Sequence, residues 1–213
     1  GINERLDFLL IEKVIKILND WEFRFCGRLS DRVKVEFDNL TKLKNFKYLG
    51  ELHTKDVVLN MLDANVGIIP YVENDVIKKS LPLKTYEYIA CGLPIVSAPI
   101  EDLKKLSNFV DFANNPKSFS KKIIIQARLK NNPDFLKICY KTAQENSYDS
   151  RFEDMVKFYS KNKSNSLKEK KGRIAFLYAS DSVHVETINE HIEAFRKYSK
   201  HKIYYIPGNT FFW

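Results

Sequence analysis

The sequence predicts an α/β protein built on a doubly wound parallel sheet. Short apolar runs of strand length alternate along the chain with longer segments of helical period. Glycine stands at several of the boundaries between them, as at Gly27, Gly50 and Gly92. Such alternation is typical of βαβ units, whose strands assemble in parallel with helices packed against the sheet.

The helical segments place apolar residues on one face and charged residues on the other. We expect helices over residues 4–19, 54–64, 119–130, 134–145 and 150–161. A further helix opens near Pro82 and stops at Gly92, because glycine is the preferred residue just past a helix end. The last three helices follow one another without a strand, so we expect them to pack on the flank of the sheet.

The strand candidates are residues 22–27, 46–49, 66–69, 94–97 and 109–112. In an open parallel sheet, ligands gather outside the carboxyl ends of the strands. We therefore look for functional residues immediately after each of these segments.

The domain organisation follows from a change in composition. We expect a first domain over residues 1–160 and a basic, solvated linker over residues 161–172, which is nearly all Lys, Ser, Asn and Glu. Residues 173–213 predict strand, helix and strand, a partial βαβ unit that is too small to hold a core unaided. That unit either docks on the first domain, pairs with another molecule or begins a longer domain; we favour the last, with the chain as a fragment.

Lys84 and Glu87 are the most informative charged pair. They stand three residues apart in the first turns of the helix near Pro82, so they share a face. The unpaired N–H groups of a helix start and the Lys84 ammonium suit a phosphate, while Glu87 can accept hydrogen bonds from sugar hydroxyls. The alternative is an ordinary surface ion pair.

The run from Ser80 to Val96, which contains Ala-Cys-Gly-Leu-Pro, resembles the donor-binding half of glycosyltransferases with the GT-B fold. The preceding strand at residues 66–69 agrees with this resemblance. The segment from Gly1 to Asp7 looks like the loop after the first strand of that half, and Phe46-Lys-Tyr-Leu-Gly50 like a later strand and turn. The resemblance covers roughly residues 1 to 160.

The resemblance implies a role for several residues. Lys84 meets the diphosphate of a nucleotide sugar, Leu83 contacts the ligand nearby, and Glu87 binds the ribose hydroxyls. Tyr71 either stacks on or hydrogen-bonds the nucleotide, or is simply a half-buried ring. Glu51 either reads the base or ribose, or caps a turn.

Two arginines and one departure complete the expected site. Arg28 and Arg5 follow strand ends and serve either as phosphate-binding cations or as partners of neighbouring carboxylates. Many retaining enzymes of this fold carry a second glutamate eight positions before the ribose-binding one, but that position holds Lys79. The stereochemical outcome therefore stays open. His184 is interpreted as an ordinary loop histidine. No catalytic base is named, because it is expected to come from the acceptor-binding half.

Composition bounds the partners and the location. The net charge of +8 suits nucleotide phosphates, nucleic acid or an acidic membrane face, and charge alone does not choose among them. No segment reaches the roughly eighteen apolar residues of a membrane span, and no signal-peptide pattern is visible. We expect a cytoplasmic protein, with contact at the inner face of the membrane left open. The three cysteines are expected to be buried thiols.

The sequence thus predicts part of a glycosyltransferase that binds a nucleotide-diphosphate sugar, with UDP-sugar as the expected donor. We expect no metal, no other cofactor and no nucleic acid partner. The acceptor is expected to be a glycan or a lipid-linked molecule bound by an acceptor-binding half that is missing here. The alternatives are a nucleotide-sugar epimerase of the same fold and a non-enzymatic, flavodoxin-like interaction module.

Overall fold

The computed structural model describes residues 1–163, and its first compact unit is Gly1–Ala143. Parallel pairing joins all neighbouring strands, which form two sheets of order β1-β2 and β3-β4-β5. The predicted α/β class with parallel strands is confirmed, although hydrogen bonds divide the strands into two sheets. The strands are β1 (Phe23–Phe25), β2 (Phe46–Tyr48), β3 (Gly67–Ile69), β4 (Ile95–Ser97) and β5 (Val110–Phe112).

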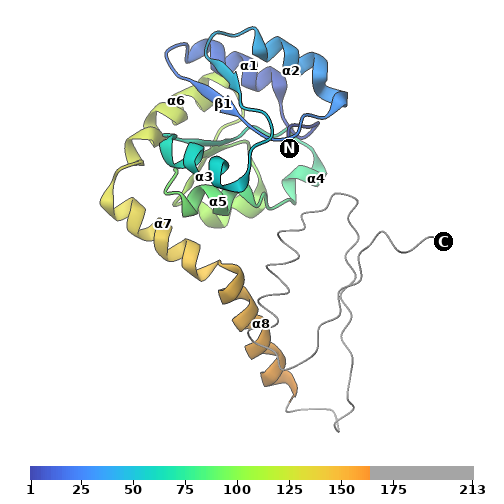
Figure 1. Ribbon diagram of the computed structural model, residues 1–213. Helices are drawn as coiled ribbons and strands as arrows, with labels where there is room; N and C mark the ends of the chain where they lie inside the picture. Colours follow the sequence, from blue (N-terminus) through green and yellow to red (C-terminus); the bar gives the residue numbers. More distant parts are fainter. Residues whose placement is uncertain (164–213) are drawn as a thin grey trace, which may run out of the picture. The chain divides into compact units, whose positions relative to one another are not determined.

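Helices lie on both sides of these strands. Figure 1 shows α1, α2 and α6 on one side and α3 and α5 on the other. α1 packs against both α2 and α6, and α6 packs against β4 and β5. The helices are α1 (Phe8–Ile17), α2 (Lys34–Thr41), α3 (Thr54–Asp63), α4 (Asp75–Lys78), α5 (Lys84–Ala90), α6 (Pro116–Gln126) and α7 (Pro133–Glu145), with short 3₁₀ turns η1 (Asp31–Val33), η2 (Glu101–Leu106) and η3 (Ala127–Leu129).

The first helix begins later than its apolar pattern suggested. Asp7 caps α1, because its carboxylate accepts a hydrogen bond of 2.9 Å from the Leu10 N–H. Residues 2–6 instead run between the two sheets, where Ile2 forms an isolated β-bridge with Leu29 and Leu6 forms one with Tyr71. These bridges place the N-terminal residues beside the segments that follow β1 and β3.

The sequence reading missed α2, which it treated as a polar connection. α2 buries only Phe37 and Leu40, and Val33 is buried just before it. These three residues have helical spacing, but they are too few to stand out from the charged residues around them. The short α4 and η2 were missed as well.

The core is densest at β4, the middle strand of its sheet. All of β4 is buried, and Ile95 and Val96 are fully inaccessible to solvent. Helices cover both faces of a parallel sheet, so its central strand is apolar along its whole length rather than alternating. The predicted helix stop is also confirmed: Gly92, at φ +64°, follows α5, and the Leu93 N–H bonds back to the Tyr88 carbonyl.

The second unit is described by itself. α8 (Tyr148–Lys163) starts after Ser147, whose hydroxyl accepts a hydrogen bond of 3.2 Å from the Ser150 N–H. At its other end, α8 continues through residues 161–163, where the linker was predicted to begin. The predicted βαβ unit of residues 173–213, including His184, lies outside the described residues, and the domain boundary near residue 160 stays a prediction. Within residues 1–163 no helix is long and apolar enough to cross a bilayer.

Asn45 links the end of α1 to the start of β2. Its side-chain amide donates to the carbonyls of Ile15, Leu18 and Trp21 at 3.1, 3.0 and 2.9 Å. These carbonyls belong to the last turn of α1 and the segment after it, where no intrahelical donor remains.

We predict that Asn45→Ala lowers the free energy of unfolding by about 2 kcal/mol, because the Ile15 and Trp21 carbonyls lose this donor at once, whereas the Leu18 carbonyl still accepts from the Trp21 N–H. Urea denaturation measures this change. The matched control is Asn39→Ala, since Asn39 accepts only a surface hydrogen bond from Lys42 and should change stability by less than about 0.5 kcal/mol. Equal effects of the two substitutions would contradict the assignment.

Candidate functional site

Backbone hydrogen bonds join the carboxyl ends of β1 and β2. The Gly27 N–H donates to the Gly50 carbonyl at 2.8 Å, and the Ile2 N–H donates to the Arg28 carbonyl at 2.8 Å. Both Gly27 and Gly50 adopt positive φ angles, +113° and +73°, at the turns where the chain leaves the strands. Arg28 and the residue after Gly50, Glu51, therefore lie at the same edge.

The same N-terminal segment also reaches the carboxyl end of β3. The Val72 N–H donates to the Arg5 carbonyl at 2.8 Å, and the Asp7 N–H donates to the Pro70 carbonyl at 2.8 Å. Arg5 is thereby fixed beside Tyr71, the residue between Pro70 and Val72. We call this continuous edge, from Gly50 through residues 1–7 to Tyr71, the carboxyl rim.

Lys84 extends onto the carboxyl rim from the start of α5. Its ammonium lies 5.4 Å from the centroid of the Tyr71 ring, within the range of a cation–π contact. The Tyr71 ring is largely buried, at 9% exposure, so it provides a fixed surface under the cation. The contact joins α5 to the loop after β3 and fixes where the positive charge stands.

Opposing effects act on the pKa of Lys84. Burial lowers the pKa of Lys84. Tyr88, Tyr71 and Glu87 raise it by more than burial lowers it, in part through a hydrogen bond from the ammonium to the Tyr71 hydroxyl. The net result is a pKa above the usual 10.5. Lys84 is therefore a permanent cation at neutral pH.

Glu87 and Leu83 flank this cation. Glu87 lies one turn along α5, is exposed, and is close enough to Lys84 to raise its pKa. Leu83 stands directly before α5 with 65% of its surface exposed. Gly1 lies within electrostatic range of Lys84, Arg5 and Glu87, so the N-terminal segment, Lys84 and Glu87 surround one region of the carboxyl rim.

The helix start contributes less to anion binding than the sequence suggested. The N–H groups of Thr85 and Tyr86 donate to the carbonyls of Pro82 and Leu83 at 3.0 and 2.9 Å. Most donors of the first turn are therefore already used. The capacity to hold an anion here rests on the ammonium of Lys84 rather than on free backbone N–H groups.

The two predicted arginines and Glu51 are exposed at the carboxyl rim. Arg28 lines an open pocket of about 420 Å³ together with Asn3, Ser30 and Arg32. Arg32 was not predicted from the sequence; it forms an ion pair of 3.1 Å with Glu4. Glu51 follows Gly50 at the turn after β2, and its role in the site stays a prediction.

Tyr88 is a site residue that sequence reasoning missed. It lies four residues after Lys84 on the same face of α5, and burial raises its own pKa. Its ring occupies the space next to Gly67 in β3, where an added Cβ would stand only 2.5 Å from it. The spacing of Lys84 and Tyr88 was a visible signal, but the close approach to Gly67 required the fold.

All three cysteines are free thiols, but only Cys139 is as buried as the sequence predicted. Cys26 and Cys91 are half-buried and Cys139 is buried. Cys26 follows β1 and interacts electrostatically with Lys84, while burial raises the pKa of its thiol. In the described part of the chain, no three His, Cys, Asp or Glu side chains are placed to hold a metal ion.

Comparison with known proteins gives a family and a fold. Residues 3–126 match the family described as Glycosyl transferases group 1. The Bacillus subtilis (strain 168) protein TuaH, which carries the name of a teichuronic acid biosynthesis glycosyltransferase, is 30% identical over 106 residues, or 50% of this chain. A crystal structure of TarM superposes with a TM-score of 0.53 and 17% identity over 75% of this chain. A structure of Staphylococcus aureus TarM in complex with UDP and other ligands gives a TM-score of 0.48 and 18% identity, over 75% of this chain and 33% of that one.

The chain spans only part of these relatives. The alignments cover 27% of TuaH and 34% of the first TarM structure. The TarM likeness shows the fold, and it agrees with the GT-B resemblance of the sequence.

We predict that Tyr71→Phe lowers the pKa of Lys84, because the ring stays in place while the hydroxyl that accepts a hydrogen bond from the ammonium is lost. An NMR titration of ¹³C-methylated lysines measures the change, with the Lys121 signal as a reference in the same sample. In the unsubstituted protein the Lys84 signal should titrate above pH 10.5. A Lys84 signal that titrates below 10.5 and does not respond to Tyr71→Phe would contradict this geometry.

Proposed function

Because the chain belongs to the group 1 glycosyl transferases, we propose that it is the donor-binding part of a glycosyltransferase and holds a nucleotide-diphosphate sugar at the carboxyl rim. The observation that carries this proposal is the Lys84 cation, fixed over Tyr71 with Glu87 one turn away. A fixed cation beside a carboxylate matches the two ends of a ribose diphosphate, which offers anionic oxygens and neighbouring hydroxyls.

In this proposal the diphosphate lies against Lys84. The ammonium donates hydrogen bonds to the phosphate oxygens, and Arg5 and Arg28 reach the same anion from the N-terminal side of the rim. A buried tyrosine cannot stack on the base from beneath Lys84, so Tyr71 acts as a positioning residue for the cation. Leu83 supplies exposed apolar surface beside the ligand.

The same cation assists sugar transfer. When the glycosidic bond to the diphosphate breaks, negative charge builds on the leaving phosphate, and a cation already in place stabilises it without reorganisation. The acceptor, which we propose is a glycan or a lipid-linked molecule, would be bound by another part of the full protein. The acceptor's base would come from there too.

We predict that Lys84→Ala weakens UDP binding by about 10- to 100-fold, the range expected when a charge-assisted hydrogen bond to phosphate is lost. Isothermal titration calorimetry with UDP, GDP and ADP measures it, and UDP is the expected best ligand. Lys121→Ala, an exposed lysine on α6, is the matched control and should bind as the unsubstituted chain does. If no nucleotide binds, or if both substitutions have the same effect, the proposed function is wrong.

A second prediction concerns Glu87. Glu87→Ala should weaken UDP binding about 10-fold but leave the binding of 2′,3′-dideoxy-UDP unchanged, because that ligand lacks the hydroxyls that Glu87 would bind. The two ligands are compared by calorimetry on the same protein. Glu12→Ala, on the remote helix α1, controls for the loss of one negative charge. A parallel loss for both ligands would show that Glu87 does not read the ribose.

A further inference from the structure

Tyr88 lies one turn after Lys84 on α5, and its side chain is directed back toward the lysine. Helical side chains lean toward the N-terminus of their helix, so the Tyr88 ring covers the turn that begins at Lys84. The backbone carbonyl of Tyr88 accepts hydrogen bonds from the N–H groups of Cys91 and Leu93 at 3.1 and 2.9 Å. The end of α5 therefore fixes the backbone from which this ring projects.

The Tyr88 ring packs against bare backbone at Gly67 in β3. A Cβ at Gly67 would stand 2.5, 2.7 and 2.8 Å from the ring atoms Cδ2, Cγ and Cε2. Rotation of the ring about its own axis leaves Cγ in place, so such a Cβ would displace the whole side chain. Gly67 itself is held, because it pairs with Ile95 in β4 and its N–H donates to the Pro94 carbonyl at 2.9 Å. The position of β3 thus decides where the Tyr88 ring lies.

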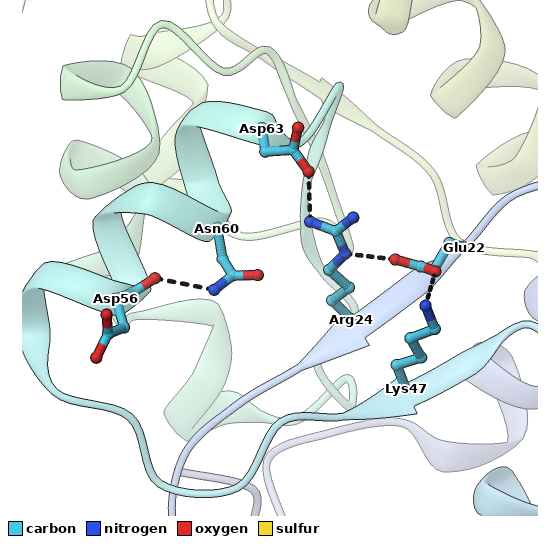
Figure 2. A network of polar contacts seen from close by, with 6 residues as sticks. All are labelled: Glu22, Arg24, Lys47, Asp56, Asn60 and Asp63. Atoms are coloured by element: carbon cyan, nitrogen blue, oxygen red, sulfur yellow. Dashed lines mark hydrogen bonds and ion pairs between the residues drawn. The ribbon is translucent and has the colours of Figure 1, made fainter.

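A network of ion pairs holds the segment that leads into Gly67. Figure 2 shows Arg24 extending from β1 to Asp63, the last residue of α3, and the two side chains meet at 2.6 Å. Glu22 accepts from both Arg24 and Lys47, which extends the network to β2. Asp63 precedes Gly67 by four residues. The backbone against which the Tyr88 ring packs is therefore tied to β1 and β2 as well as to β4.

A second ring confines Lys84 from the loop after β3. The ammonium stands over Tyr71, 5.4 Å from the ring centroid, and Tyr71 is joined to the N-terminal segment by its bridge with Leu6. Of the side chains that raise the pKa of Lys84, Tyr88 has the largest effect and Tyr71 follows. Burial raises the pKa of Tyr88 itself, so its phenol is neutral at neutral pH. Lys84 is thus flanked by one ring from its own helix and one from the loop after β3.

This confinement matters because a lysine side chain is long and flexible. A side chain that becomes ordered only when a ligand arrives weakens binding by the conformational entropy that it loses. A lysine that is already confined between two rings loses less. Tyr88 can therefore strengthen the binding of an anion that it does not touch.

We propose that Tyr88 is a second positioning residue for Lys84, besides Tyr71. Its ring, packed on Gly67, keeps the ammonium over Tyr71, where a diphosphate oxygen would meet it. Gly67 is required at its position because it leaves the room that the ring fills. The effect on nucleotide binding rests on the proposed function, whereas the placement of Lys84 does not.

The first test follows Lys84 by NMR without nucleotide. Protons over the face of an aromatic ring are shifted upfield by its ring current, so the Lys84 Hε signal should lie upfield of that of Lys121, an exposed lysine on α6. Tyr88→Leu removes the ring and should move the Lys84 signal toward that of Lys121. Tyr88→Phe keeps the ring and should leave the signal in place. Gly67→Ala displaces the ring without removing it and should act as Tyr88→Leu does.

Tyr86→Leu is the matched control. Tyr86 is half-buried like Tyr88, but it lies two residues earlier, on nearly the opposite face of α5, so the Lys84 signal should not respond. The amide spectrum of each variant shows whether it is folded, and Tyr88→Leu and Gly67→Ala each decide the question alone if the other does not fold. The proposal is overturned if either folded variant leaves the Lys84 signal upfield, or if Tyr86→Leu or Tyr88→Phe moves it as far as Tyr88→Leu.

The second test is a double-mutant cycle on UDP binding. Tyr88→Leu should weaken binding about 3- to 10-fold when Lys84 is present, the range expected when one more side chain must be ordered. It should have no effect in the Lys84→Ala background, because Tyr88 acts through the lysine. An equal loss in both backgrounds would contradict the proposal. If no nucleotide binds at all, the proposed function fails, and the NMR comparison still decides whether Tyr88 positions Lys84.

Discussion

The candidate site depends on the backbone hydrogen bonds of residues 1–7, which reach both sheets at their carboxyl ends. Ile2 bonds to Arg28 on one side, and Arg5 bonds to Val72 on the other. Without these bonds the strand ends of β1 and β3 would have no common edge, because the strands themselves do not pair. The N-terminal segment therefore sets the distance between the arginines on the rim and the Tyr71 ring.

On this edge, the proposed function rests chiefly on one cation. Lys84 stands over a largely buried aromatic ring, with Tyr88 one turn behind it, and this surrounding raises its pKa although burial alone would lower it. A charge fixed in this way pays little reorganisation when an anion arrives. The same packing explains Gly67, because any side chain there would displace the Tyr88 ring that supports the cation.

The sequence was sufficient for the strands, and for α5, because apolar runs and a terminating glycine are local signals. It also placed Lys84, Glu87, Tyr71 and the two arginines at one edge, since the carboxyl ends of parallel strands meet. It could not predict α2, whose buried face is only Phe37 and Leu40, or the division into two sheets. Both depend on tertiary packing, as does the use of the α5 first-turn N–H groups by nearby carbonyls.

The central claim is that Lys84, held by Tyr71 at the carboxyl rim, contacts the diphosphate of a nucleotide. A crystal structure of the protein with bound UDP tests it most directly. The account predicts a phosphate oxygen within hydrogen-bond distance of the Lys84 ammonium and a ribose hydroxyl at the Glu87 carboxylate. A nucleotide bound elsewhere, or phosphates that leave Lys84 without contact, would contradict the account.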